Sequence, residues 1–169
     1  MIENKRVQIF TYPPLGQEIA NAVTHGVGAG LSVAGTVLLI VHSLTFGVKG
    51  IIGACLYGAS LIILYAASCI YHALAPCAGK KVFRILDHCS IFLLIFGTYI
   101  PVAWLLFDDA LGWSIFGVIG ATSALGISLN AVSLERFDKV CQILYLVAGW
   151  AIVFLNTTIL LRFKRGKNS

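Results

Sequence analysis

Charged side chains are scarce in this sequence. Only 11% of its 169 residues are Asp, Glu, Lys or Arg, against roughly a quarter in a soluble domain. Hydrophobic residues make up 59% of the chain, and its mean hydropathy is +0.91. Several uninterrupted apolar runs reach about 20 residues, the length that crosses a bilayer as a helix. The sequence therefore excludes a soluble domain and predicts an all-α, polytopic transmembrane helix bundle.

Other familiar patterns are also missing. Residues 1–22 hold no short apolar core before a cleavage site, so no secretory signal is predicted. The net charge of +5 comes from Lys and Arg in loops and tails, and we expect membrane lipids, not nucleic acid, as partners. The five cysteines lack metal-finger spacing and are interpreted as small buried thiols. Cys77 and Cys89 flank a basic stretch, but a disulfide between them would need an oxidising compartment.

Five candidate spans follow a cytosolic juxtamembrane segment at 1–22. The links between the spans are short, so neighbouring spans must be antiparallel. Span one contains Gly26 and Gly30, a GxxxG pair that lets helices approach closely. A basic tail closes the chain at 162–169. The expected spans are about 23–46, 48–71, 89–107, 111–134 and 140–161.

Lys and Arg in the links predict the orientation, because cytoplasmic links carry an excess of them. With the N-terminus in the cytosol, the outer links hold only Lys49, together with Asp108 and Asp109. The inner segments hold Lys5, Arg6, Lys80, Lys81, Arg84, Arg136 and Lys139. The N-terminus is therefore expected inside, in a multi-pass protein of the cell (inner or plasma) membrane. The basic tail conflicts with this topology, since five spans would place it outside.

Polar groups collect near the expected cytosolic edge. Glu18, Asn21 and His25 share one helical face if span one starts early. Ser68 and His72 are spaced i, i+4 at the end of span two. Asp87 and His88 are expected at the start of span three, after a short loop that carries Lys80, Lys81 and Arg84.

These side chains have two interpretations. Carboxylates such as Asp87 and Glu18 are favoured at helix N-termini and could serve as caps. As a set, however, ionisable groups beside a bilayer are costly unless they are paired, which favours a functional site. A neutral imidazole such as that of His72 binds zinc, and a nearby carboxylate can orient it or take a proton. No second His stands at ligand spacing from His72.

Three ordered motifs resemble the hemolysin III family of bacterial membrane proteins, relatives of the adiponectin and progestin receptors. The resemblance covers about residues 14 to 155. The first motif is Glu18-x-x-Asn21-x-x-Thr24-His25 and the second is Ser68-x-x-x-His72. The third is Leu86-Asp87-His88, which leads into Gly97-Thr98-Tyr99-x-Pro101.

The resemblance implies seven helices with a cytosolic N-terminus and a zinc near the inner leaflet. It assigns His72 as a zinc ligand, with Ser68 and Asp87 as catalytic residues beside the metal. The two further family ligands form an HxxxH pair in the last helix, which has no counterpart here. We therefore expect a five-helix chain that does not hold zinc tightly and is inactive if it ends at residue 169.

Three functions follow as alternatives. The first is a zinc-dependent membrane hydrolase that acts on lipid amides, as the resemblance implies. The second is a membrane-perturbing or channel-like hemolysin, and the third is a non-catalytic regulator of membrane state. A channel should carry polar residues along a whole span, whereas spans two and three are polar mainly at their inner ends.

Overall fold

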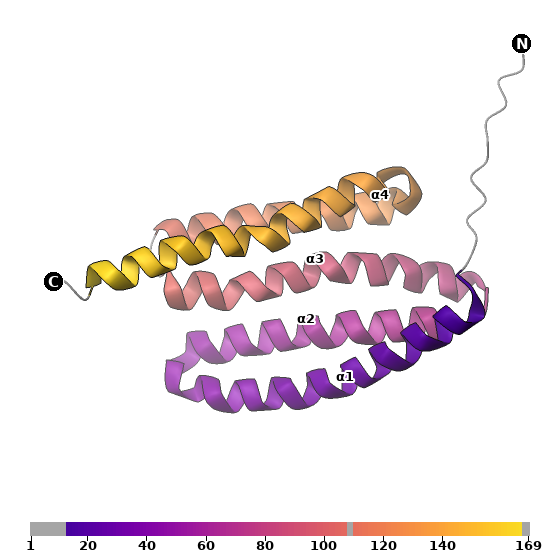
Figure 1. Ribbon diagram of the computed structural model, residues 1–169, viewed down its shortest axis with the longest axis horizontal. Coiled ribbons are helices and arrows are strands. Elements are labelled where there is room, and N and C mark those ends of the chain that lie inside the picture. The colour runs from indigo at the N-terminus through magenta and orange to yellow at the C-terminus, as the bar shows by residue number, and fades with distance from the viewer. Residues whose placement is uncertain (1–12, 108–109, 167–169) are drawn as a thin grey trace, which may run out of the picture.

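The computed structural model describes residues 13–107 and 110–166, with side chains up to residue 155. The described chain forms long helices that pack side by side (Figure 1), and no strand occurs among these residues. The prediction of an all-α bundle is confirmed. The elements are α1 (Leu15–Ser43), the 3-10 turn η1 (Leu44–Phe46), α2 (Gly47–Ala73), α3 (Ala78–Leu106) and α4 (Ala110–Gly166).

Three helical stretches of the described chain have the length and composition needed to cross a membrane. They are Leu15–Ala73, Ala78–Leu106 and Ala110–Leu155. The first comprises α1 and α2, which lie against one another with the chain reversing at η1 (Figure 1). The third is interrupted at Ser133, whose φ of −164° and ψ of 100° are extended. These helices define a multi-pass membrane protein.

The two halves of α4 double back on one another at this interruption. The Cys141 thiol lies 3.8 Å from the Gly126 carbonyl oxygen, and these residues stand on opposite sides of Ser133. Figure 1 shows the second half of α4 returning alongside the first. The chain therefore reverses direction within one helical element.

Helices α1 and α2 approach closely through glycine. A Cβ on Gly28 would lie 2.7 Å from the Tyr65 ring, and one on Gly26 would lie 3.3 Å from the Cys69 sulfur. A Cβ on Gly30 would meet nothing within 4 Å. The close approach therefore depends on Gly26 and Gly28, and the GxxxG spacing of Gly26 with Gly30 is incidental here.

The start of α3 corrects one expectation. The stretch expected as a loop is helical, because α3 begins at Ala78, well before the expected residue 89. Cys77 is the extended residue before the helix, and its sulfur accepts a hydrogen bond from the Lys80 backbone N–H at 3.4 Å. Asp87 consequently lies inside α3 and cannot cap it. Hydropathy marked where the helix becomes apolar, which is later than where it begins.

The opposite end of the bundle holds an apolar core between α3 and α4. The Tyr99 hydroxyl, buried there, donates a 2.7 Å hydrogen bond to the Ala148 carbonyl. A free hydroxyl would be costly in such surroundings, so this bond fixes where the second half of α4 packs on α3. The core residues are Tyr99, Ala103, Phe107, Ile115, Ile119 and Ala148.

Helix α1 leaves a stripe of large apolar side chains uncovered. Its side chains are spaced four residues apart, so they form one oblique i, i+4 ridge on the helix surface. Its members are at least half exposed in the described structure. Such a surface is expected where a helix faces lipid. The stripe consists of Leu15, Ile19, Val23, Val27 and Leu31.

Candidate functional site

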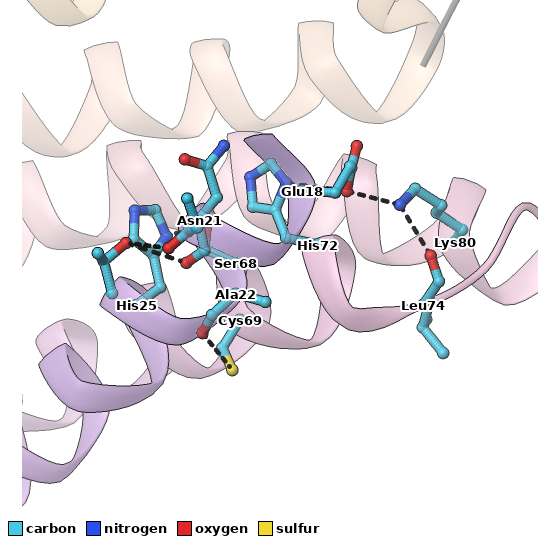
Figure 2. A network of polar contacts seen from close by, with 11 residues as sticks. Glu18, Asn21, Ala22, His25, Ser68, Cys69, His72, Leu74 and Lys80 are labelled. Carbon is cyan, nitrogen blue, oxygen red and sulfur yellow. Dashed lines mark hydrogen bonds and ion pairs between the residues drawn. The ribbon is translucent and has the colours of Figure 1, made fainter. Parts of the chain in front are cut away.

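Three helices bring polar side chains together at one end of the bundle (Figure 2). Helix α1 contributes from its first turns, α2 from its last turns and α3 from its first turn. The shared face of Glu18 and His25 was conditional on an early helix start. Helix α1 starts at Leu15, earlier than the expected residue 23, so both residues lie on it. We call this set the polar cluster: Glu18, Asn21, His25, Ser68, His72 and Lys80.

The first contact in the polar cluster joins α1 to α2. His25 Nδ1 lies 2.6 Å from Ser68 Oγ, a hydrogen bond between residues far apart in the sequence. Ser68 is buried, with only 2% of its surface exposed. The His25 ring also meets the Tyr65 ring edge-on at 5.8 Å and the His72 ring at 5.9 Å between centroids. The Ser68 hydroxyl is therefore hydrogen-bonded to an imidazole and shielded from solvent.

The second contact joins all three helices. His72 Nδ1 donates to Glu18 Oε2 at 3.2 Å, and the Lys80 ammonium donates to the same oxygen at 2.8 Å. Lys80 also donates to the Leu74 carbonyl oxygen at 2.8 Å and lies over the Tyr71 ring at 5.0 Å. The side chains of Glu18 and Lys80 are 8% and 3% exposed. A buried ion pair of this kind requires close pairing, because either charge alone would be poorly solvated.

The remaining sequence-predicted residues lie apart from these contacts. Asp87 and His88 are half-buried further along α3. Among the described residues, no hydrogen bond or ion pair joins Asp87 to Ser68 or His72. Asn21 is half-buried on α1, and its backbone oxygen accepts a bond of 3.2 Å from the Thr24 hydroxyl. The roles assigned to Asp87, His88 and Asn21 stay predictions.

Lys80 is the member that sequence reasoning placed elsewhere, as a loop charge that sets topology. Its position could have been anticipated from the turn at Pro76 and Cys77, which starts α3 just before it. A Lys in the first turn of α3 can then point back toward the end of α2. The counterpart charge on Glu18 gives the reason why burial is tolerated.

A cavity of about 460 Å³ adjoins the polar cluster. Its polar lining comes from Glu18, His72 and Lys80, and its apolar lining includes Leu15 and Ile19 of the α1 stripe. Glu18 Oε1 is buried and has no hydrogen-bond partner among the described residues. The cavity thus joins a polar floor to a lipid-facing wall.

The donor set does not fit a metal centre. The described part of the chain holds no group of three His, Cys, Asp or Glu side chains placed to bind a metal ion. Glu18 Oε2 is already engaged by an ammonium and an imidazole N–H. Zinc sites use at least three protein ligands, so the described residues do not by themselves make the zinc site that the resemblance implies.

Comparison with known proteins agrees with the class set by the fold, a multi-pass helical membrane protein. The sequence matches the family described as "Haemolysin-III related" over residues 15–169. The chain belongs to the hemolysin III family, as its motifs suggested. Since the match begins at residue 15, where α1 begins, it includes all of the polar cluster.

Two curated relatives give the extent of the similarity. The chain is 36% identical over 138 residues to Hemolysin-3 of Bacillus cereus, covering 81% of this chain and 63% of the relative. It is 32% identical over 138 residues to the Hemolysin-3 homolog of Bacillus subtilis (strain 168), covering 81% and 65%. The matched part thus spans less than two thirds of each relative's length. No solved structure matches the chain.

Proposed function

We propose that this hemolysin III family protein acts on a lipid at the polar cluster. The observation that carries the proposal is the burial of Glu18, Ser68 and Lys80 together where three long apolar helices meet. Polar side chains placed inside a membrane bundle are expensive, and they usually mark a site of function. The cavity lined by Glu18, His72 and Lys80 gives a lipid headgroup a place to bind.

The reaction class that we propose is hydrolysis of an acyl bond, in line with the lipid-amide hydrolases that the resemblance implies. The Ser68 hydroxyl would hydrogen-bond the reacting water or the substrate carbonyl, and His25 would orient that hydroxyl through Nδ1. Asp87 would take or supply a proton from α3. Zinc has no assigned step in this proposal, because the described residues supply no group of three ligands.

We also propose five crossings with a cytosolic N-terminus in the cell membrane. The break at Ser133 and the reversal at η1 each divide a long stretch into two antiparallel helices. Arg84 on α3 lies 3.3 Å from Glu135, just after the break, so the break is on the same end as the polar cluster. The basic residues Arg136 and Lys139 follow there, which supports a cytosolic assignment for this end.

Lipid turnover by protein in phosphatidylcholine nanodiscs tests the proposed function. The expected result is release of fatty acid from a lipid amide or ester, detected by mass spectrometry and lost in Ser68→Ala and His72→Ala. Ser60→Ala and His42→Ala are the matched controls: Ser60 is buried elsewhere on α2, where its hydroxyl donates to the Tyr57 carbonyl oxygen, and His42 lies near the far end of α1. Undiminished release in both cluster variants would refute the assignment of the site.

A second candidate is membrane perturbation, which the printed name of the relatives, Hemolysin-3, supports. Dye release from liposomes tests it on the same preparation. The two buried charged side chains, Glu18 and Lys80, lie at one end of the bundle, which favours a site over a continuous pore. Release that Ser68→Ala leaves unchanged would favour the perturbing role.

A further inference from the structure

The polar floor of the cavity is balanced in charge. Glu18 and Lys80 form a direct ion pair, so their two formal charges cancel within the buried site. Lys80 also donates a hydrogen bond to the Leu74 carbonyl oxygen. A ligand headgroup with its own net charge would therefore leave an unmatched charge in a poorly solvated place, which is costly. An uncharged headgroup avoids this cost.

The floor also holds a buried hydrogen-bond acceptor without a donor. Glu18 Oε1 has no donor among the described residues although it is buried. The carboxylate can only accept hydrogen bonds, so the group that it lacks is an O–H or N–H. A hydroxyl on an uncharged headgroup supplies such a donor.

The wall of the cavity continues into the apolar stripe of α1. Leu15, Ile19 and Val23 line the cavity, and Val27 and Leu31 continue the same i, i+4 ridge away from it. From Leu15 to Leu31 the stripe is about 24 Å long at 1.5 Å per residue. This length exceeds half of a hydrocarbon core of about 30 Å. One acyl chain can lie along it while the head remains at the floor.

We propose that the cavity binds a lipid with an uncharged, hydroxyl-bearing head, of the monoacylglycerol or diacylglycerol kind. The hydroxyl donates to Glu18, and one acyl chain lies along the α1 stripe. This inference rests on the proposed function, since it concerns the same site, and it names the class of lipid that the site accepts. Its test measures lipid binding and does not require lipid hydrolysis.

The experiment uses a monoacylglycerol with a diazirine in its acyl chain, in phosphatidylcholine nanodiscs with a chelator present. After irradiation, mass spectrometry locates the label. The expected label lies within Leu15–Leu31, and unlabelled monoacylglycerol competes about tenfold better than a fatty amine or a phosphatidic acid. Ala75→Trp narrows the cavity and should abolish the label, because Ala75 lines it. Ala78→Trp, an exposed position outside the lining, should retain it.

Variants that remove one charge of the Glu18–Lys80 pair test whether the pair selects the headgroup charge or only holds the helices together. Glu18→Gln leaves Lys80 unmatched, so the anionic competitor should gain at least about tenfold over the neutral one. Lys80→Met leaves the carboxylate unmatched and should favour the fatty amine by a similar factor. A purely structural role for the pair would not reverse the order of competitors. Labelling outside α1, label retained in Ala75→Trp, or a charged competitor preferred by the wild-type protein would each overturn the proposal. Labelling as expected without lipid turnover would refute only the proposed hydrolysis.

Discussion

The Lys80 ammonium lies 2.8 Å from Glu18 Oε2 and so ties the start of α3 to the start of α1. These residues are 62 positions apart in the chain. Their side chains are almost wholly buried, and the same carboxylate oxygen accepts the His72 N–H. The pair thus determines how three helices meet at the polar cluster.

Removal of this ion pair from one side should destabilise the bundle. Lys80→Met leaves a buried carboxylate without its counter-ion, and we expect a loss of roughly 3–5 kcal/mol in the free energy of unfolding. Lys81→Met is the matched control, because Lys81 is exposed and its change should stay within about 0.5 kcal/mol. Thermal unfolding in detergent, with helicity as the signal, measures both. Equal midpoints in the two variants would contradict the prediction.

Gly28, at the α1–α2 contact, and Gly30, away from it, predict opposite outcomes for the same substitution. Gly28→Ala places a methyl group 2.7 Å from the Tyr65 ring and should cost about 1–3 kcal/mol through overpacking. Gly30→Ala meets open space and should be neutral or stabilising by up to about 1 kcal/mol, since Ala favours the helix. The thermal unfolding midpoints of the two variants in detergent are the measurement. A lower midpoint for Gly30→Ala than for Gly28→Ala would show that the helices meet elsewhere.

The proposed orientation predicts which end of the bundle faces the cytosol. In a protein freed of its native cysteines, Lys81→Cys should react with an impermeant thiol reagent only after the cells are opened. Val48→Cys, at the other end of the bundle, should react in intact cells. Both positions are exposed in the structure. The reverse pattern would show that the N-terminus lies outside.

Zinc content is predicted from the donor set. The described residues supply no group of three ligands, so the chain 1–169 should retain far less than one zinc per protein after dialysis. A His72→Ala variant should then show the same content as the wild-type protein. Elemental analysis of both preparations is the measurement. One zinc per chain in the wild-type protein, lost in His72→Ala, would contradict this prediction.

Much of the fold could be predicted from the sequence because long apolar runs, short links and helical spacing are local properties. The positions of Glu18 and His25 on one face of α1 followed from spacing alone. The start of α3 did not, because charged residues such as Lys80 fit a helix as well as a loop, and a sulfur cap at Cys77 leaves no hydropathy signal.

The contacts within the polar cluster could not be predicted from the sequence, for a different reason. The resemblance grouped Ser68 with Asp87 beside a metal on His72, and the hydrogen bond that Ser68 makes to His25 was not foreseen. Which of several nearby polar groups pair depends on rotation and depth of the helices, and these are set by packing at glycines such as Gly28. Spacing along one helix carries no information about that rotation.

The single extended residue at Ser133 bears on how the protein is made. Its φ of −164° is open to any amino acid, so the reversal requires no special residue at this position. Residues on both sides already touch, as Cys141 and Gly126 do. With the five crossings proposed above, the two halves of α4 are expected to enter the membrane together as one hairpin, because residues on both sides of the one-residue break already contact each other.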